Sequence, residues 1–436
     1  MVLFWFRRDL RLEDNAGLFR ALQSGIPVQP VFVFDREILD KLENRSDARV
    51  QFIYRELHQI NSELAAWGAQ IWVHYGSPLE AHRQWLSEHP EIQGVFANRD
   101  YEPYARKRDE QIEQLYQSEG RWFKGSKDHV VFEKSEVAKG DGTAYSVFTP
   151  YSRRWRERLA QEGINHFNSL ELLSSGLRKE PSAKPIPSLE SMSFSPSDLP
   201  VPPRVWSDEV IRAYASRRNF PAEEQGTTRL GLHLRFGTLS IRKLLRHAAD
   251  HSETFVSELI WRDFYQMLLY HFPDSPSKAV KPAYDRIQWE TSEENFNAWC
   301  EGRTGYPMVD AGMRQLNATG FMHNRVRMVV ASFLTKHLLI DWRWGEAYFA
   351  QKLLDYDQAS NVGGWQWASG SGNDAAPYFR IFNPQSQLEK FDPKMVYVKH
   401  WVPEFGTAKY PKPIVEHSFA RQRCLERYKS ALAAGY

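Results

Sequence analysis

This chain has few cysteines, and its net charge is close to zero. Only two of the 436 residues are cysteines, Cys300 and Cys424, which argues against a disulfide framework and against a cysteine-rich metal site. A reducing compartment, cytoplasmic or otherwise intracellular, is the simplest setting. The net charge is only +2, so a nucleic-acid-binding face must be a local basic patch.

Long apolar runs are missing as well. No stretch approaches the length that a membrane span needs. The opening residues, MVLFWFRRDLRLED, do not resemble a signal peptide, because their apolar part is too short and the charges follow it. We therefore expect no membrane partner.

Several common catalytic motifs are also absent: the phosphate-binding P-loop, the HExxH zinc motif and the GxSxG nucleophile elbow. Residues 370–375, GSGNDA, imitate a dinucleotide-binding fingerprint, but no strand precedes them. We interpret this match as accidental. No metal site is expected.

The apolar pattern divides the chain into three parts. In the first part, short apolar runs alternate with helical patterns, which predicts βαβ units and a parallel sheet. The predicted strands are Val2–Phe6, Val31–Phe34, Ile71–Tyr75 and Gly94–Asn98. Seven prolines between residues 171 and 203 then predict an extended linker. After about residue 205 only helical patterns remain.

The predicted architecture is therefore an α/β domain over residues 1–130, a connector over 131–204 and an all-α domain over 205–436. The predicted helices of the last part are 208–216, 241–248, 254–271, 293–299, 307–320, 323–339 and 345–354. Fifteen Trp stand out in the composition. Counts alone favour large aromatic cores over base stacking or electron transfer.

The most informative segment is 355–384, DYDQASNVGGWQWASGSGNDAAPYFRIFNP. It combines Asp355 and Asp357 with an Asn, paired glycines and two Trp, and we interpret it as an ordered loop. Paired glycines allow the backbone to approach another group closely. A plain acidic surface loop is the alternative, and the Gly-Gly pair with Trp365 and Trp367 favours a ligand site.

A second cluster shares one face of a predicted helix, at three- and four-residue steps: Glu258, Trp261, Arg262 and Tyr265. A partly buried Glu needs a partner, and Arg beside Trp suits contact with phosphate and base together. An Arg–Glu pair capping a core Trp is about equally compatible with this helix.

Basic residues recur on two more predicted helices. Residues 322–328, MHNRVRM, precede a run of core residues, so the helix is mostly buried and its Arg side chains need acidic or phosphate partners. Asp355 is a candidate partner for Arg327. Residues 151–156, YSRRWR, suit phosphate contact, although an exposed helix face is the commoner meaning of such a pattern.

Together these motifs resemble the photolyase/cryptochrome flavoprotein family, closest to its cyclobutane pyrimidine dimer photolyases. The resemblance covers nearly the whole chain. It rests on FWFRRDLRLEDN, VFTPYSRRW, GTTRLGLHLRFGTLS, ELIWRDFY, GRTGYPMVDAGMRQL, FMHNRVRM and GGWQWASGSGNDAAPYFRIFNP. It implies a Rossmann-like α/β domain, a long connector and a helical FAD-binding domain.

The resemblance implies two groups of FAD-binding residues. Tyr214 and the segment Thr227, Thr228, Arg229, Leu230 and Gly231 match the part of the family that holds the phosphates and ribityl chain; most members have Ser where Gly231 stands. The residues implied nearer the flavin ring and the adenosine of FAD are Glu258, Arg327, Asp355, Tyr356, Asp357 and Asn361. Of these, Asn361 is implied to face flavin N5.

The resemblance also implies lesion and DNA contacts. Trp261 and Trp367 match aromatics that sandwich the flipped lesion, and Glu258, Asn324 and Met328 line that pocket. The other implied DNA contacts are Arg218, Arg262, Arg325, Arg380 and Gln387. An electron relay from the surface to the flavin is implied for Trp289, Trp342 and Trp365. The expected activity is light-driven repair of dimers in UV-damaged DNA by electron transfer from reduced FAD.

Three alternatives stay open. Plant-type cryptochromes, which sense light without repair, usually carry Asp at the position of Asn361. Repair enzymes for the (6-4) photoproduct use a His pair where this chain has His323 and Asn324. A nucleotide-binding hydrolase or transferase leaves the helical motifs unexplained.

A second, antenna chromophore is compatible with the resemblance, but its identity is open. Members with the familiar folate site carry Asn-Glu near the position of Tyr104 and Ala105, and this chain does not. We expect a monomer.

Overall fold

The computed structural model describes residues 1–180 and 184–433, which form two compact units with discontinuous ranges. The first unit comprises Met1–Val137, Arg153–Val205 and Leu230–Asp250. The second comprises Ala138–Ser152, Trp206–Arg229 and the chain from His251 onward. Pro181 of the predicted linker lies outside the described residues. The boundaries at 130 and 204 stay a prediction.

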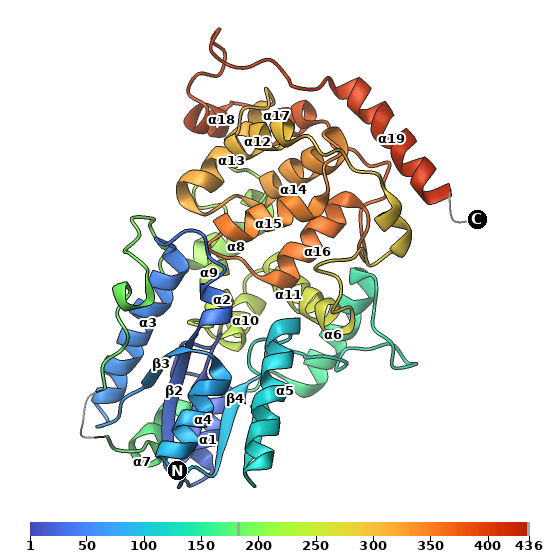
Figure 1. Cartoon of the computed structure of the whole chain (residues 1–436). Helices are drawn as coiled ribbons and strands as arrows, with labels where there is room; N and C mark the ends of the chain where they lie inside the picture. The colour runs from blue at the N-terminus through green and yellow to red at the C-terminus, as the bar shows by residue number, and fades with distance from the viewer. Residues whose placement is uncertain (181–183, 434–436) are drawn as a thin grey trace. The chain divides into compact units, whose positions relative to one another are not determined.

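The first unit contains a parallel five-stranded sheet in the order β3-β2-β1-β4-β5 (Figure 1). Its strands are β1 (Val2–Phe6), β2 (Val28–Asp35), β3 (Trp72–Gly76), β4 (Gly94–Asn98) and β5 (Trp122–Ser126). The four predicted strands and the parallel pairing are confirmed. The fifth strand, WFKGS, was not predicted, because it is neither a continuous apolar run nor a clean alternation.

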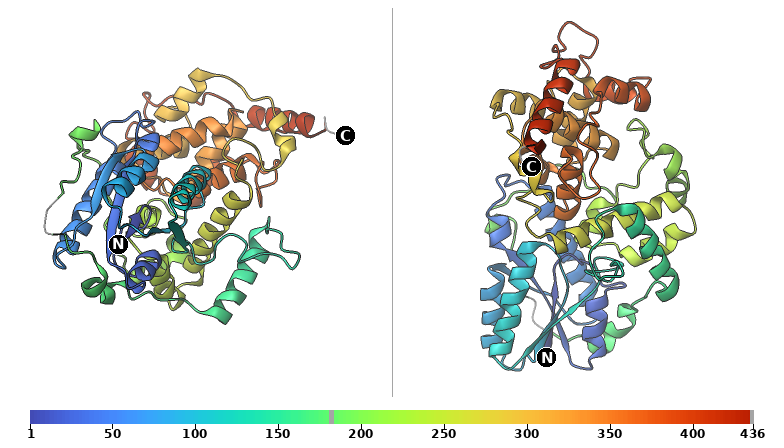
Figure 2. Two further views of the ribbon diagram at one scale, coloured as in Figure 1. Left: turned by 60° about the horizontal axis from the view of Figure 1, so that its bottom comes forward. Right: turned by 90° about the vertical axis from the view of Figure 1, so that its right-hand side faces the viewer.

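Helices cover both faces of this sheet, since successive side chains of a strand point to opposite sides. Val2, Phe4 and Phe6 share a core with residues of α1 and α3, whereas Leu3 and Trp5 pack with residues of α4 and α5. The right-hand view of Figure 2 shows helices on both sides of the strands. The bounds are α1 (Ala16–Gln23), α2 (Arg36–Leu39), α3 (Ala48–Ala65), α4 (Pro78–Glu88) and α5 (Pro103–Ser118).

A buried ionic network joins residues 230–250 to the rest of the first unit. Arg11 and Arg242 each donate to the Asp128 carboxylate at 2.8 Å, and Arg242 also contacts Asp14 at 3.3 Å. These two cations hold the pKa of Asp128 at about 2, against the raising effect of its burial. The network connects α10 (Ile241–Ala249) to this unit, to which α9 (Gly231–Phe236) also belongs.

Shorter helices complete the region between the sheet and residue 205. Helix α6 (Phe148–Glu162) begins in the second unit and continues into the first from Arg153. The others are η1 (Ser169–Leu172), α7 (Leu173–Gly176) and η2 (Glu190–Met192).

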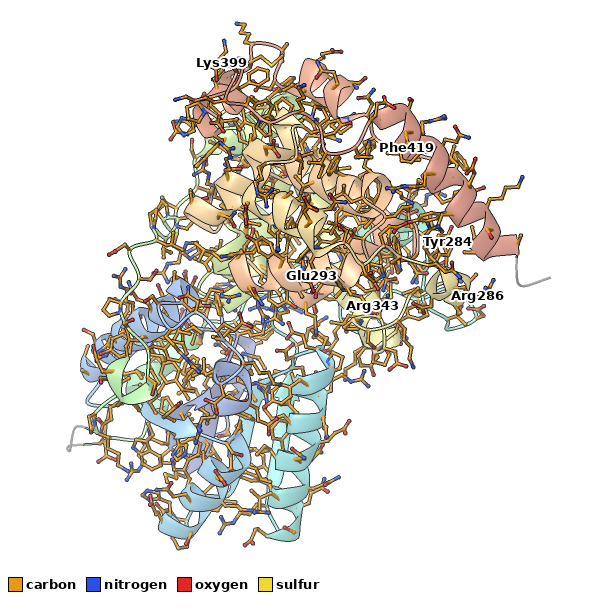
Figure 3. All side chains as sticks on the ribbon, turned by 45° about the horizontal axis from the view of Figure 1, so that its top comes forward. Tyr284, Arg286, Glu293, Arg343, Lys399 and Phe419 are labelled. Carbon is orange, nitrogen blue, oxygen red and sulfur yellow. The ribbon has the colours of Figure 1, made fainter. Side chains whose placement is uncertain are left out.

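The second unit is helical throughout its named elements, as predicted. The helices are α8 (Asp208–Arg217), α11 (Glu253–His271), η3 (Pro282–Arg286), α12 (Glu293–Glu301), α13 (Pro307–Thr319), α14 (Asn324–Ser332), η4 (Phe333–His337), α15 (Trp342–Lys352), α16 (Gln358–Ser369), α17 (Pro384–Phe391), α18 (Val396–Trp401) and α19 (His417–Ala433). One aromatic-rich core runs through α12 to α18. In Figure 3 the labelled Tyr284 and Arg286 of η3 lie near α19, and Arg286 donates to the carbonyl oxygen of Ala431 at 3.1 Å.

Two sequence predictions are wrong in this unit. Residues 355–384 were expected to be an ordered loop, but residues 358–369 form helix α16. Asp357 begins that helix by accepting from the Ser360 N–H at 3.0 Å, and Gly370 ends it at a φ of 87°. The single helix expected over 323–339 is α14 followed by a π-helical turn, η4.

No helix among the described residues is both long and apolar enough to span a bilayer.

Candidate active site

Three helices of the second unit carry ten of the predicted site residues: Glu258, Trp261, Arg262, Asn324, Arg325, Arg327, Met328, Asn361, Trp365 and Trp367. These helices are α11, α14 and α16, and both α11 and α14 pack against α16. The packing brings together residues that are about 100 positions apart in the sequence.

The predicted pair of Arg327 and Asp355 is present. The Arg327 Nη2 donates to both carboxylate oxygens of Asp355, at 3.0 and 2.9 Å. Its Nε donates to the carbonyl oxygen of Met322 at 2.8 Å, which fixes the plane of the guanidinium group. A hydrogen bond between two charged groups is roughly twice as strong as one between neutral groups.

Asp357 lies beside a polar side chain that the sequence analysis missed. The Gln266 amide of α11 donates to both Asp357 oxygens, at 3.1 and 3.0 Å. The other atom of that amide, Gln266 Oε1, is buried and has no hydrogen-bond partner within the part of the chain that the structure describes. A buried acceptor without a donor is costly unless a ligand supplies one.

Asn361 contacts a second residue that was missed, Glu346 of α15. The Asn361 amide donates to the Glu346 carbonyl oxygen at 3.2 Å and to its Oε1 at 3.0 Å, and the Tyr356 hydroxyl donates to the same Oε1 at 3.2 Å. Burial raises the pKa of Glu346, while these two donors lower it. A lone Glu in the aromatic sequence WRWGEAYF was the available signal.

Glu258 and Arg218 form an ion pair between α11 and the end of α8. Burial raises the pKa of Glu258, and the Arg218 charge and hydrogen bond lower it. The guanidinium carbon of Arg218 also lies 5.2 Å from the ring centre of Tyr214. The sequence predicted that Glu258 needs a partner, and the structure identifies Arg218 as that partner.

Trp261 belongs to a cluster of aromatic rings on α11. Its ring lies parallel to that of Phe148, with centres 3.7 Å apart and an angle of 5° between the planes. Phe264 meets Trp261 edge-on at 5.6 Å, and Tyr265 is tilted at 5.5 Å. Gly363 of α16 allows close approach here, since a Cβ atom would lie 2.2 Å from the Tyr265 ring.

The start of α14 holds further basic residues that the sequence singled out. The His323 Nδ1 accepts from the Arg325 N–H at 3.1 Å, and burial lowers the pKa of His323 to about 4, so the ring is neutral. Arg325 donates to the Asn219 side chain at 2.8 Å and stacks on Phe391. Asn324 is exposed and Met328 is half-buried.

Known proteins resemble this chain over almost its whole length. Residues 2–169 match the family model described as DNA photolyase, and residues 255–409 match the FAD binding domain of DNA photolyase. The deoxyribodipyrimidine photo-lyase of Vibrio cholerae is 36% identical, over 99% of this chain and 100% of the relative. The chain belongs to the DNA photolyase family.

Solved structures of that family have the same fold. An archaeal photolyase from Sulfolobus tokodaii, described with two FAD molecules, is 34% identical with a TM-score of 0.79, covering 98% of this chain and 99% of that one. A cryptochrome from Synechocystis is 25% identical with a TM-score of 0.85, covering 98% of each chain. Fold alone therefore does not separate repair from sensing.

The residues of this photolyase-family chain fit an FAD cofactor. The unpartnered Gln266 Oε1 is an acceptor for a ligand N–H, and Asp357 lies beside it. On α16 a Cβ atom at Gly364 would meet open space, whereas the neighbouring Gly363 is packed. A buried acceptor without a donor and a helix backbone that no side chain covers are features of a ligand site.

The implied phosphate-binding segment crosses from one unit to the other. Thr227, Thr228 and Arg229 belong to the second unit, and Leu230 and Gly231 to the first. Arg229 has a φ of 52°, a conformation that is unfavourable for a residue with a side chain and that occurs often at ligand sites. Its guanidinium carbon lies 4.9 Å from the ring centre of Phe321.

The implied relay residues differ in exposure. Trp365 and Trp342 are buried, and Trp289 is half-buried. Trp365 packs edge-on against Phe349 at 5.0 Å, and Gly345 lets α15 approach it, because a Cβ atom there would lie 2.1 Å from the indole. Trp289 meets Tyr428 of α19 edge-on at 6.1 Å. The path through the three Trp stays a prediction.

The remaining implied DNA contacts are spread over several segments of the second unit. Arg262 is on α11, Trp367 on α16, 6.3 Å from Phe382 between ring centres, and Gln387 on α17. Arg380 follows in the segment after α16, and the adjacent Phe379 is 62% exposed.

The position of the familiar folate pair is occupied differently in the first unit. The Tyr104 hydroxyl donates to the Asp35 carboxylate at 2.5 Å, at the carboxyl end of β2, and Ala105 is buried.

Proposed function

We propose that this chain repairs cyclobutane pyrimidine dimers in DNA, using light and reduced FAD. The observation that carries the proposal is the packing of α11 and α14 against α16, which gathers cofactor residues such as Arg327 and Asn361 and lesion residues such as Trp261 into one unit. The full-length similarity to a deoxyribodipyrimidine photo-lyase supports it.

The cofactor side of the site consists of paired polar groups. Arg327 supplies a counter-charge to Asp355, and the neutral Gln266 amide orients the Asp357 carboxylate by hydrogen bonds. Glu346 orients the Asn361 amide, and Tyr356 shares that carboxylate. When bound, reduced FAD supplies one electron on illumination, and the residues described here bind and orient it.

The lesion side consists of aromatic and amide groups. Trp261 and Trp367 stack on the dimer once it has left the duplex, which stabilises the extruded state by about 1–3 kcal/mol per base. Glu258 and Asn324 hydrogen-bond the pyrimidine edges, and Met328 lines the same pocket. Because Glu258 is paired with Arg218, its carboxylate keeps a counter-charge before DNA binds.

DNA is held by basic side chains around this pocket. Arg218, Arg262, Arg325 and Arg380 contact phosphates, with Gln387 beside them. Since the net charge is only +2, binding depends on this local patch and weakens steeply with salt.

A repair assay tests the proposal. The reduced holoprotein is illuminated with an oligonucleotide that contains one thymine dimer, and the dimers remaining are counted against a dark control. Loss of dimers only in the light is expected. Binding of FAD without any light-dependent loss of dimers would reject repair.

A cryptochrome-type light sensor is the second candidate, because a cryptochrome has the same fold. Asn361 favours repair, since an amide cannot give up a proton to stabilise a flavin radical state suited to signalling. Asn324 after His323 favours cyclobutane dimers over (6-4) photoproducts. The same assay with (6-4) substrate separates the two repair activities.

We also propose that the protein is a monomer in an intracellular compartment, and that any second chromophore differs from the familiar folate arrangement. The Tyr104–Asp35 contact supports the last point. Light scattering of the purified protein and the absorption spectrum of its extracted pigments test these proposals.

A further inference from the structure

Phe148 lies against the ring that the proposed function assigns to lesion stacking. The two ring centres are 3.7 Å apart, and the planes are within 5° of parallel. One face of the Trp261 indole is therefore covered by protein. Only the opposite face remains for a base.

This arrangement is not one that two free rings prefer. Aromatic pairs favour an offset or edge-to-face geometry with centres about 4.5–7 Å apart. The parallel contact at 3.7 Å must therefore be maintained by the structure around it.

Two contacts of Phe148, and a third made by its neighbour Tyr151, hold this segment in place. Its backbone N–H donates to the Asp374 carboxylate at 3.3 Å. Its ring meets the fully buried Phe264 edge-on at 5.8 Å. Tyr151, one helical turn further along α6, packs on the same Phe264 at 5.0 Å. Because its position is fixed in this way, the Phe148 ring stays against Trp261.

We propose that Phe148 is a positioning residue for the lesion, which acts by fixing the plane of the Trp261 ring before DNA binds. The inference rests on the proposed function and deepens it. A free Trp side chain loses rotational freedom when a base stacks on it, and a ring that is already fixed avoids this loss. Phe264, edge-on to both rings, prevents the pair from tilting together.

The test compares binding, in the dark, of one oligonucleotide with and without a single thymine dimer. Phe148→Ala raises the Kd for dimer DNA about fivefold to tenfold, the range expected for losing one pre-ordered side chain. It leaves the Kd for undamaged DNA and the FAD content unchanged. Val147→Ala, which changes an exposed neighbour in the same segment, leaves both affinities unchanged.

Two conservative variants separate positioning from simple space filling. Phe148→Tyr keeps a flat ring and restores dimer affinity. Phe148→Leu keeps the apolar volume without a flat ring and does not restore it. Full restoration by Leu would overturn the proposal, and so would wild-type dimer affinity in Phe148→Ala. Tighter dimer binding by Phe148→Ala would show that Phe148 competes with the lesion, which also overturns it.

The wild-type protein distinguishes this result from failure of the proposed function. If the wild-type chain does not prefer dimer DNA, the proposed function fails first. If it does prefer dimer DNA and the Phe148 variants match it, only the positioning role fails.

Discussion

Single residues in the second unit show how partly buried carboxylates are tolerated in this chain. Asp355, Asp357, Glu258 and Glu346 each have a donor within hydrogen-bonding range. Asp355 and Glu258 are paired with arginines, whereas Asp357 and Glu346 accept from neutral amide and hydroxyl groups. A charge without any such partner would be strongly destabilising. The pairs therefore indicate orientation of functional groups more than they indicate stability.

Replacing Arg327 measures how much its pair with Asp355 contributes to stability and how much to FAD binding. Arg327→Ala leaves the Asp355 carboxylate without its two-oxygen partner, so we expect a loss of about 1.5–3 kcal/mol in the free energy of unfolding and a lower FAD content. Urea denaturation and the ratio of flavin to protein absorbance measure these effects. Arg212→Ala, which removes an exposed contact of 3.9 Å, should change neither quantity.

Replacing Asn361 tests its contact with Glu346. Asn361→Asp puts a second carboxylate near Glu346 Oε1, now 3.0 Å from the amide nitrogen, and burial already raises the pKa of Glu346. Mutual repulsion raises the folded-state pKa further, so the variant binds more protons folded than unfolded and loses stability as the pH rises.

We expect the Asn361→Asp variant to be destabilised by about 1–2 kcal/mol more at pH 8 than at pH 5, roughly one pKa unit of interaction. Urea denaturation at the two pH values measures this difference. Asn361→Ser carries no charge and serves as the control. Equal pH dependence of the two variants would mean that residue 361 and Glu346 do not interact.

At the scale of elements, the sequence predicted the strands and helices that have a regular spacing of apolar residues. Buried strands such as Val2–Phe6 are continuous apolar runs, and α11 has the three- and four-residue spacing of a helix. Helix α16 was missed because Gly, Ser and Asn reduce its intrinsic helix propensity. Its formation depends on the Asp357 cap and on packing against α11 and α14, which no local pattern shows.

The paired glycines of α16 provide a matched test of this packing. Gly363→Ala would place a Cβ atom 2.2 Å from the Tyr265 ring, whereas Gly364→Ala would place one in open space. We expect Gly363→Ala to destabilise the protein by about 1–3 kcal/mol. Gly364→Ala should stabilise the FAD-free protein by about 0.5–1 kcal/mol.

Urea denaturation of both FAD-free variants measures these effects. A loss of FAD affinity in the Gly364 variant would further locate the cofactor at this helix. Equal stability changes at the two positions would contradict the packing described for α16.

At the scale of the whole molecule, the sequence predicted the fold class and one side-chain pair, Arg327 with Asp355, but not the other partners of the proposed site residues. Glu258 was expected to need a partner, yet Arg218 lies 40 positions away, directly after the end of α8. Phe148 was not singled out at all, because its contact with Trp261 spans 113 positions, the difference between the two residue numbers. Such pairs are set by tertiary packing, and no spacing in one sequence encodes them.

Buried histidines also act at this scale, because they link global stability to pH. His337 is buried between Phe333 and His417, and burial lowers its pKa to about 3. The ring is therefore neutral in the folded state at pH values where the unfolded chain takes up a proton. The unfolded state binds more protons below about pH 6.5, so the stability contributed by neutral His337 is present above that pH and is lost as the pH falls toward 3.

His337→Gln removes this linkage. At pH 7 the variant should be less stable than the wild type, since it loses the 2.8 Å contact with His417. The stability difference should then shrink by about 1.4 kcal/mol for each pH unit between 6 and 4. Urea denaturation across this range measures it, with His58→Gln at an exposed position of the first unit as the control. A difference that stays constant with pH would show that His337 takes up a proton in the folded protein, and hence that its site is open to water.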